Sequence, residues 1–152
     1  MISPDVIAAA QASHQRYWPR GPFCSITLAQ YGLESAWGRD CSGVNNTFGI
    51  KATQAQIAAG ECRLVWTKEQ DPTGHVYTIR QYFANYPSLE ACFDAHAALL
   101  TSSHYTACEN AQTPEAYAMA LHACGYATDI HYATKLIDII NESNLKQYDQ
   151  TF

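Results

Sequence analysis

A single glutamate, Glu34, lies at the edge of an apolar helical stripe in the first third of the sequence. The stripe recurs at steps of three and four residues: Ile26, Ala29, Leu33, Ala36 and Trp37. Glu34 is rotated by about 100° from Leu33, so its carboxyl group should meet the core on one side and solvent on the other. A carboxylic acid in that setting can hold its proton near neutral pH and act as a general acid. The alternative is a solvated helix charge, the usual role of a lone glutamate.

The residues around Glu34 form a longer ordered pattern. Ala29-Gln30-x-x-Leu33-Glu34-Ser35-x-Trp37-Gly38 is followed by Asn45-Asn46-x-Phe48-Gly49-Ile50-Lys51. This pattern resembles the signature of the glucosaminidase family of glycoside hydrolases (family 73), which cleave bacterial cell-wall peptidoglycan. The resemblance covers residues from about 8 to 148. It implies a lysozyme-like fold in which Glu34 is the principal catalytic residue.

The resemblance also suggests a second carboxylate, which glycosidic cleavage requires. Thr67-Lys68-Glu69 is similar to the Thr-x-Glu that the family carries before a hairpin turn, and Glu69 takes the place of its glutamate. A general base acting through water would lie roughly 6.5–9.5 Å from the acid, although a mobile hairpin can hold it farther away in the free enzyme. Glu61 and Asp71 are competing carboxylates. A solvated hairpin charge is the alternative role of Glu69.

A third cluster lies near the carboxyl end of the chain. Gly125-Tyr126-Ala127-Thr128-Asp129-x-x-Tyr132 is similar to the family's Gly-Tyr-Ala-Thr-Asp-Pro-x-Tyr motif, with Ile130 in place of the proline. The resemblance implies that Tyr126 lines the site, where it would stack on the reacting sugar or bind its acetamido group. We expect Asp129 to cap a helix and Tyr132 to form core or cleft wall.

Four further residues are expected to contact substrate or shape the site. Asn46 should tie down the loop after the Glu34 helix by bonding to backbone. Phe48 begins the next lobe, so its role is architectural first and substrate contact second. Trp66 and Tyr77 are expected sugar subsites on the hairpin, although most aromatic side chains serve the core.

The first half of the chain predicts helices followed by strands. Ser3 and Pro4 predict the start of a helix that ends near residue 18, and Gly38 is expected to end the Glu34 helix. Aromatic and β-branched residues then predict strands at 48–50, 63–66 and 76–83. The turn composition of residues 71–74 joins the last two strands as an antiparallel hairpin. The segment 52–60 is either a loop or a helical turn.

After residue 87 the sequence returns to helical patterns. N-cap signals predict helices at 88–100 and 113–124, with a short helix near 103–110 between them and a last helix after Asp129. The polar tail from Asn144 is expected to pack loosely. The predicted fold class is mainly α (α+β). One lysozyme-like catalytic domain spans 1–152, with a small β-hairpin lobe flanking a substrate cleft and no separate wall-binding module.

Composition excludes several functional classes. The formal net charge is −5 with nine Lys and Arg, which argues against nucleic acid as a partner. No run is long enough to insert in a membrane, and residues 6–10 lack a preceding basic region, so we expect no signal peptide and synthesis in the bacterial cytoplasm. No metal or other cofactor is expected, because His and Cys lack ligand spacing. The six cysteines are either small buried hydrophobes or partly paired after export.

The resemblance implies an endo-β-N-acetylglucosaminidase that acts, as a monomer, on peptidoglycan glycan strands at the cell wall. A compact enzyme without a signal peptide is similar to the endolysins of phages or prophages, which a membrane-permeabilising partner releases. An N-acetylmuramidase or a lytic transglycosylase on the same scaffold is the nearest alternative enzyme. A non-catalytic peptidoglycan-binding structural component is the alternative from another class, and the intact Glu34 motif argues against it.

Overall fold

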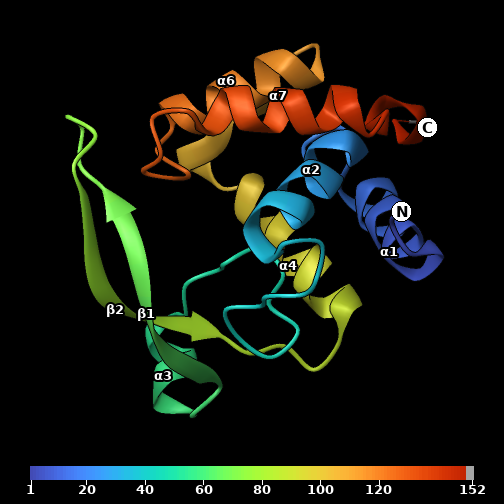
Figure 1. The fold of residues 1–152 in the computed structure, drawn as a ribbon. Helices are drawn as coiled ribbons and strands as arrows, with labels where there is room; N and C mark the ends of the chain where they lie inside the picture. The colour runs from blue at the N-terminus through green and yellow to red at the C-terminus, as the bar shows by residue number, and fades with distance from the viewer. Residues whose placement is uncertain (150–152) are drawn as a thin grey trace.

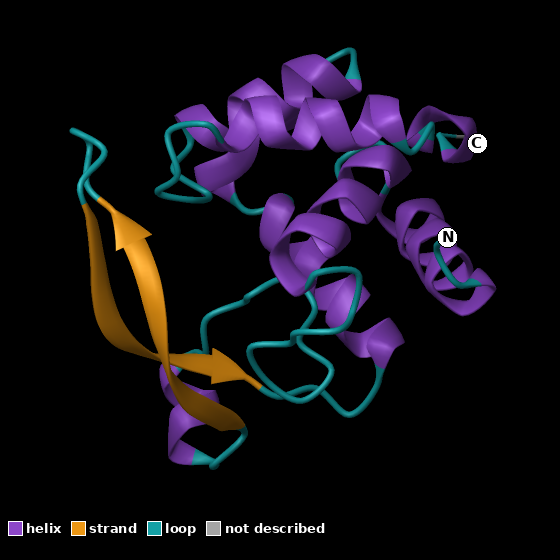
Figure 2. Cartoon of the chain, in the orientation of Figure 1, coloured by secondary structure: helices purple, strands orange, loops and turns teal. Residues whose placement is uncertain are grey.

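The computed structural model describes residues 1–149 of the 152-residue chain. Within them, a body of α-helices carries a two-stranded antiparallel sheet on one side, so the hairpin stands beside the body (Figure 1). Figure 2 shows that loops connect the hairpin to the body at the hairpin's base. The prediction of a mainly helical domain with a small hairpin lobe is confirmed.

Two helices form the amino-terminal part of the body. Helix α1 (Pro4–Tyr17) begins as predicted, because the Ser3 hydroxyl accepts a hydrogen bond from the Val6 amide and proline occupies the first turn. Helix α2 (Cys24–Ser35) is buried along most of its length and contacts α1, α6 and α7. Packing on several sides holds α2 rigidly, which fixes the position of Glu34 near its carboxyl end.

Helix α2 ends at Ser35, so the prediction of a stop at Gly38 is wrong. The Ser35 hydroxyl donates to the Tyr31 carbonyl (2.6 Å) and accepts from the Gly38 amide (2.9 Å), and this closes the helix end. Ala36 and Trp37 adopt left-handed conformations with φ of 49° and 59°. The Trp37 ring folds back over α2 against Gly32, where a Cβ would lie within 2.7 Å of the ring. Packing therefore holds a backbone that local sequence preference disfavours.

The hairpin consists of β1 (Cys62–Gln70) and β2 (Val76–Ala84), in a register that pairs Glu69 with Tyr77. The predicted strand at 48–50 is wrong, since that segment is a loop with a single bridge between Lys51 and Phe83. The buried Asn46 side chain bonds both backbone groups of Ile50, and the Ile50 carbonyl also accepts from the Ala84 amide of β2 (3.0 Å), so the segment is tied to β2 without forming a strand.

Residues 52–60, for which the sequence allowed either a loop or a helical turn, contain a short helix, α3 (Gln54–Ala58). A capping box starts it: the Thr53 hydroxyl accepts from the Gln56 amide, and the Gln56 side chain accepts from the Thr53 amide. Helix α3 lies at the base of the hairpin, away from α6 (Pro114–Ala123) and α7 (Tyr132–Glu142) (Figure 1).

The carboxyl-terminal half is helical as predicted. Its elements are α4 (Leu89–Leu100), η1 (Ser103–Tyr105), α5 (Thr106–Glu109), α6 (Pro114–Ala123), α7 (Tyr132–Glu142) and η2 (Leu145–Tyr148). The expectation that Asp129 caps the last helix is wrong, because the N-cap of α7 is His131. The Asp129 carboxylate instead accepts from the His131 amide (2.8 Å) just before the helix and pairs with Lys135.

The expectation of a loosely packed tail is wrong as far as residue 149. Leu145 is completely buried, and the Asp149 carboxylate accepts hydrogen bonds from the Ser25 amide (2.7 Å) and hydroxyl (2.6 Å) at the start of α2. One buried side chain and one polar anchor are enough to hold a segment that reads as polar. Residues 150–152 of the predicted tail lie outside the described residues.

All six cysteines lie in the described part of the chain and are free thiols there, and Cys24, Cys92 and Cys108 are buried. Among residues 1–149, no helix is both long enough and apolar enough to span a bilayer.

Candidate active site

A cleft of about 620 Å³ runs between the helical body and the hairpin. It brings together the three sequence motifs: the end of α2 with Glu34, the end of β1 with Glu69, and the loop before α7 with Tyr126. Residues 48–51 and Tyr132 complete its wall. Three segments far apart in the sequence thus converge on one groove.

Glu34 is partly buried at the wall of this cleft. The Tyr132 hydroxyl donates a 2.9 Å hydrogen bond to Glu34 Oε1, and Oε2 lies toward Gly49. Burial raises the pKa of Glu34 to about 7; the Tyr132 bond lowers it, and the negative charges of Glu69 and Asp129 raise it further. The carboxyl group therefore carries its proton in a large fraction of molecules at neutral pH, as a general acid must.

Glu69 lines the same cleft from the hairpin side. The Thr128 hydroxyl donates a 2.7 Å hydrogen bond to Glu69 Oε2, and Lys51 Nζ lies 3.9 Å from Oε1. These two contacts come from different segments and hold the carboxylate in place. The competing Asp71 is used elsewhere: its carboxylate binds the amides of Thr73 and His75 within the hairpin turn.

The hairpin end is joined to the loop before α7 by a pair of hydrogen bonds that we call the latch. The Thr128 hydroxyl accepts from the Gln70 amide (2.9 Å), and Gln70 Oε1 accepts from the Ile130 amide (2.9 Å). A proline at position 130, as in the family motif, has no N–H for the second bond. Isoleucine at this position therefore allows a second bond between the hairpin end and the loop before α7.

Tyr126 lies in the cleft wall beside Tyr132. The two rings stack with centroids 5.7 Å apart and an interplanar angle of 23°, and Tyr105 supports Tyr126 from another side at 6.0 Å. Burial raises the pKa of Tyr126 well above its ordinary value. Its hydroxyl therefore stays neutral and can donate a hydrogen bond to a bound substrate.

Two of the expected contact residues are buried instead of exposed to the cleft. Asn46 has 0% exposure, and its side chain donates to the carbonyls of Ile50 and Ala84 (both 2.9 Å), which confirms its loop-tying role. Phe48 edges the cleft at 1% exposure and stacks on His96, with centroids 4.0 Å apart. Direct substrate contact by Asn46 would require this loop to open, because no part of its side chain reaches the surface.

Trp66 and Tyr77 lie on opposite faces of the hairpin. Tyr77 is the direct cross-strand partner of Glu69 and so shares its face, whereas Trp66 is an odd number of residues from Glu69 and projects to the other side. Trp66 is 68% exposed, with the Arg80 guanidinium 5.7 Å from its ring centre. The expected Trp66 subsite is therefore not part of the cleft wall, while Tyr77 stands next to it.

Sequence reasoning missed two buried polar residues behind Glu34. Gln30 on α2 and His96 on α4 both have 0% exposure and are hydrogen-bonded to each other. The sequence carries a signal for such residues, because a polar residue on the apolar face of a predicted helix requires a hydrogen-bond partner.

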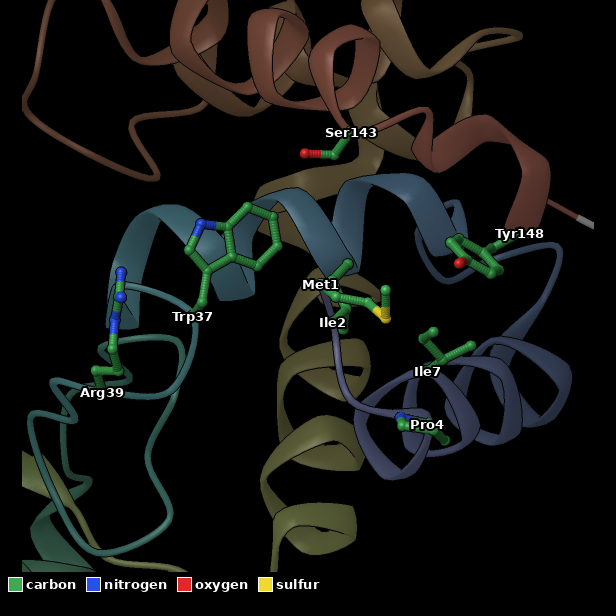
Figure 3. Close-up of a pocket in the computed structure, with 8 residues that line it drawn as sticks. All are labelled: Met1, Ile2, Pro4, Ile7, Trp37, Arg39, Ser143 and Tyr148. Atoms are coloured by element: carbon green, nitrogen blue, oxygen red, sulfur yellow. The ribbon is translucent and has the colours of Figure 1, made fainter.

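A larger cavity of about 820 Å³ lies elsewhere on the body, between α1, the Trp37 turn and the carboxyl-terminal segment (Figure 3). Its described lining residues include no Asp or Glu: Met1, Ile2, Pro4, Ile7, Trp37, Arg39, Ser143 and Tyr148. Acid chemistry therefore belongs to the smaller cleft. Within residues 1–149, no group of three or more His, Cys, Asp or Glu side chains could hold a metal ion.

Known proteins share both the sequence and the fold. Peptidoglycan hydrolase FlgJ of Salmonella typhimurium is 38% identical over 124 residues, which are 77% of this chain and 38% of that protein. Exo-glucosaminidase LytG of Bacillus subtilis is 34% identical over 134 residues, or 83% of this chain and 46% of that protein. The chain spans less than half the length of these two relatives.

Two solved structures have the same architecture. The catalytic domain of the autolysin Auto from Listeria monocytogenes matches with a TM-score of 0.75 and 33% identity, covering 95% of this chain and 84% of that one. The glycoside hydrolase domain of Salmonella typhimurium FlgJ matches with a TM-score of 0.66 and 28% identity, covering 97% and 91%. The family model Glucosaminidase, described as mannosyl-glycoprotein endo-beta-N-acetylglucosaminidase, matches residues 8–145. The chain therefore belongs to the glucosaminidase family of glycoside hydrolases.

Proposed function

We propose that this protein is a peptidoglycan hydrolase, an endo-β-N-acetylglucosaminidase that cleaves the glycan strand after N-acetylglucosamine. The single observation that carries the proposal is the cleft carboxyl group of Glu34, which burial keeps partly protonated at neutral pH. Membership of the glucosaminidase family supports the reaction, and the names of the FlgJ and LytG relatives support the substrate.

In the proposed reaction Glu34 gives its proton to the glycosidic oxygen, and the bond between that oxygen and the anomeric carbon breaks. Positive charge develops on the sugar, and the Glu69 carboxylate on the opposite wall stabilises it or activates the attacking water. Tyr126 is placed to bind the 2-acetamido group, which in some glycosidases attacks the anomeric carbon itself. The anomer of the first product, followed by NMR, separates the direct displacement by water from the routes through an intermediate.

The test is a digest of purified peptidoglycan with the reducing ends of the products identified by mass spectrometry. The proposal expects new reducing-end N-acetylglucosamine. New reducing-end N-acetylmuramic acid would indicate a muramidase, and 1,6-anhydromuramic ends would indicate a lytic transglycosylase. Internal fragments in the early products distinguish endo cleavage from the exo cleavage named for LytG.

The biological setting is a separate proposal that rests on the sequence expectation alone. We propose that the protein is an endolysin, which acts at the wall as a monomer after a second protein permeabilises the membrane. Expression in the cytoplasm should then leave bacteria intact until chloroform permeabilises the membrane, when the culture should lyse. Light scattering of the purified protein tests the monomer.

A further inference from the structure

A chain of buried hydrogen bonds runs from Glu34 into the core. The Tyr132 hydroxyl bonds Glu34 Oε1 at 2.9 Å, Gln30 Nε2 bonds the Tyr132 hydroxyl at 2.8 Å, and His96 Nε2 bonds Gln30 Oε1 at 2.7 Å. Gln30 and His96 have 0% exposure and Tyr132 has 2%. Three polar side chains in a core are costly unless each is paired. Of its four members only Glu34 and Tyr132 line the cleft, so the two residues behind them can act on the acid only through the hydrogen bonds.

The unpaired nitrogen of His96 fixes which group donates and which accepts in each of these hydrogen bonds. His96 Nδ1 is buried and has no hydrogen-bond partner within residues 1–149. A buried N–H without an acceptor is the costlier defect, so the neutral ring carries its proton on Nε2. His96 then donates to Gln30 Oε1, and the Gln30 amide donates to the Tyr132 oxygen. The Tyr132 proton is left to bond Glu34 Oε1.

The surroundings keep His96 in this state. Its ring stacks on Phe48 at an interplanar angle of 17°, and complete burial lowers its pKa to about 3. Its stacking partner Phe48 and its hydrogen-bond partner Gln30 do not titrate. The titrating groups around Glu34 at the other end are Glu69, Asp129, Tyr126 and Tyr132. The imidazole therefore stays neutral over the pH range in which Glu34 changes charge.

We propose that His96 and Gln30 are positioning residues that hold Tyr132 as a hydrogen-bond donor to Glu34 Oε1, so that the acid proton resides on Oε2. Oε2 is the oxygen that lies toward Gly49 on the cleft wall. A proton on Oε1 would point at Tyr132 and away from a glycosidic oxygen. The catalytic part of this inference rests on the proposed role of Glu34, whereas the direction of the hydrogen bonds does not.

The first test uses the wild-type protein. Histidines labelled with ¹⁵N, with the His96 signals assigned by their loss in a His96→Gln variant, report tautomer and charge directly. We expect the neutral Nε2–H tautomer at every pH from 5 to 8. An Nδ1–H tautomer, or an imidazolium forming in that range, would overturn the assigned direction whatever the enzyme's substrate proves to be.

The second test compares variants that keep or remove single bonds. In His96→Gln the new amide can place an N–H where Nε2 was, so kcat and the pH profile should stay near wild type. In His96→Leu, Gln30 is free to turn its carbonyl toward Tyr132. We then expect kcat to fall about tenfold with KM unchanged, and the pKa of Glu34 to rise because the Tyr132 bond that lowers it is lost.

Gln30→Glu is the second probe, needed if His96→Leu does not fold. The new carboxylate still accepts from His96 but cannot donate to Tyr132, so it should produce the same fall in kcat and rise in the Glu34 pKa. Ser13→Ala is the matched control, since it removes a buried hydroxyl that donates to the Phe93 carbonyl and takes no part in the hydrogen bonds from His96 to Glu34. It should lower stability without moving the pH profile. Wild-type kcat and pH profile in folded His96→Leu or Gln30→Glu would refute the proposal.

Discussion

The Tyr132 hydroxyl donates a 2.9 Å hydrogen bond to Oε1 of Glu34 where the start of α7 meets the end of α2. Burial raises the pKa of Glu34 to about 7, and this bond lowers it. The pKa of Glu34 is therefore raised by burial and lowered by a hydrogen bond from a helix far along the chain.

Removing the Tyr132 hydroxyl should raise the pKa of Glu34. A hydrogen bond to a charged group contributes about 1.5 kcal/mol or more, so Tyr132→Phe should shift the pKa upward by roughly one unit. A ¹³C-NMR titration of the glutamate carboxyl groups measures it without requiring activity. Tyr148→Phe, at the other cavity, is the control. An unchanged or lower pKa in Tyr132→Phe would contradict this assignment.

Neutralising Glu69 should act on Glu34 in the opposite direction. The charge of Glu69 raises the pKa of Glu34, so Glu69→Gln should lower it and move the acid out of its useful range. Activity should fall, but less completely than in Glu34→Gln. Peptidoglycan turbidity assays across pH, paired with the same ¹³C titration, give both readouts. Full activity in Glu69→Gln would remove Glu69 from the mechanism.

The raised pKa of Glu34 predicts a pH-dependent loss of stability. Glu34 keeps its proton up to about pH 7 in the folded state, whereas the unfolded state releases it near pH 4.5. The stability that the protonated Glu34 contributes to the folded state is therefore fully present below pH 4.5 and is lost as pH rises through about 7. The difference is on the order of 3 kcal/mol. Glu34→Gln should therefore gain stability over wild type between pH 4.5 and 8.

Urea denaturation of both proteins at the two pH values measures this difference, with the exposed Glu142→Gln as control. An identical pH dependence in wild type and Glu34→Gln would show that Glu34 titrates normally.

The latch predicts a specific effect of restoring the family proline. Ile130→Pro removes the N–H that bonds Gln70 Oε1, so the hairpin end should open more often. Hydrogen exchange of residues 66–80 should accelerate, and KM should change severalfold. Ile130→Val keeps the N–H and should behave as wild type. Equal exchange rates in the Pro and Val variants would mean that the bond does not hold the hairpin.

The two hairpin aromatic residues should differ in their effect on substrate affinity. Tyr77 shares the face of Glu69, so Tyr77→Ala should raise KM about fivefold, the value of roughly 1 kcal/mol of aromatic contact. Trp66 faces away, so Trp66→Ala should leave KM unchanged. Steady-state kinetics on soluble glycan fragments measures both, and the reverse order of effects would refute the assigned faces.

Local patterns predicted the elements that depend on local chemistry. Ser3, Ser88 and Thr113 start helices because their hydroxyls accept from amides three residues ahead, which the sequence shows directly. The end of α2 was mispredicted because a serine hydroxyl and the packing of Trp37 replaced the glycine stop. Leu145 and Asp149 hold the tail through contacts with distant parts of the chain.

The sequence motifs predicted the residues of the cleft, but they did not predict the hydrogen bonds that hold those residues in place. Glu34, Glu69 and Tyr126 stand in one cleft as the resemblance implied. The residues that set their chemistry could not be paired from the sequence, since Gln30, His96 and Tyr132 come from three helices. The latch likewise depends on a tertiary contact between Gln70 and the loop before α7.

The most direct test of the central claim is the digestion of purified peptidoglycan by wild type and Glu34→Gln, matched for fold by circular dichroism and for binding by sedimentation with the walls. We predict that Glu34→Gln binds the walls as wild type does yet releases no new N-acetylglucosamine reducing ends. Release at the wild-type rate by Glu34→Gln would show that another group supplies the proton.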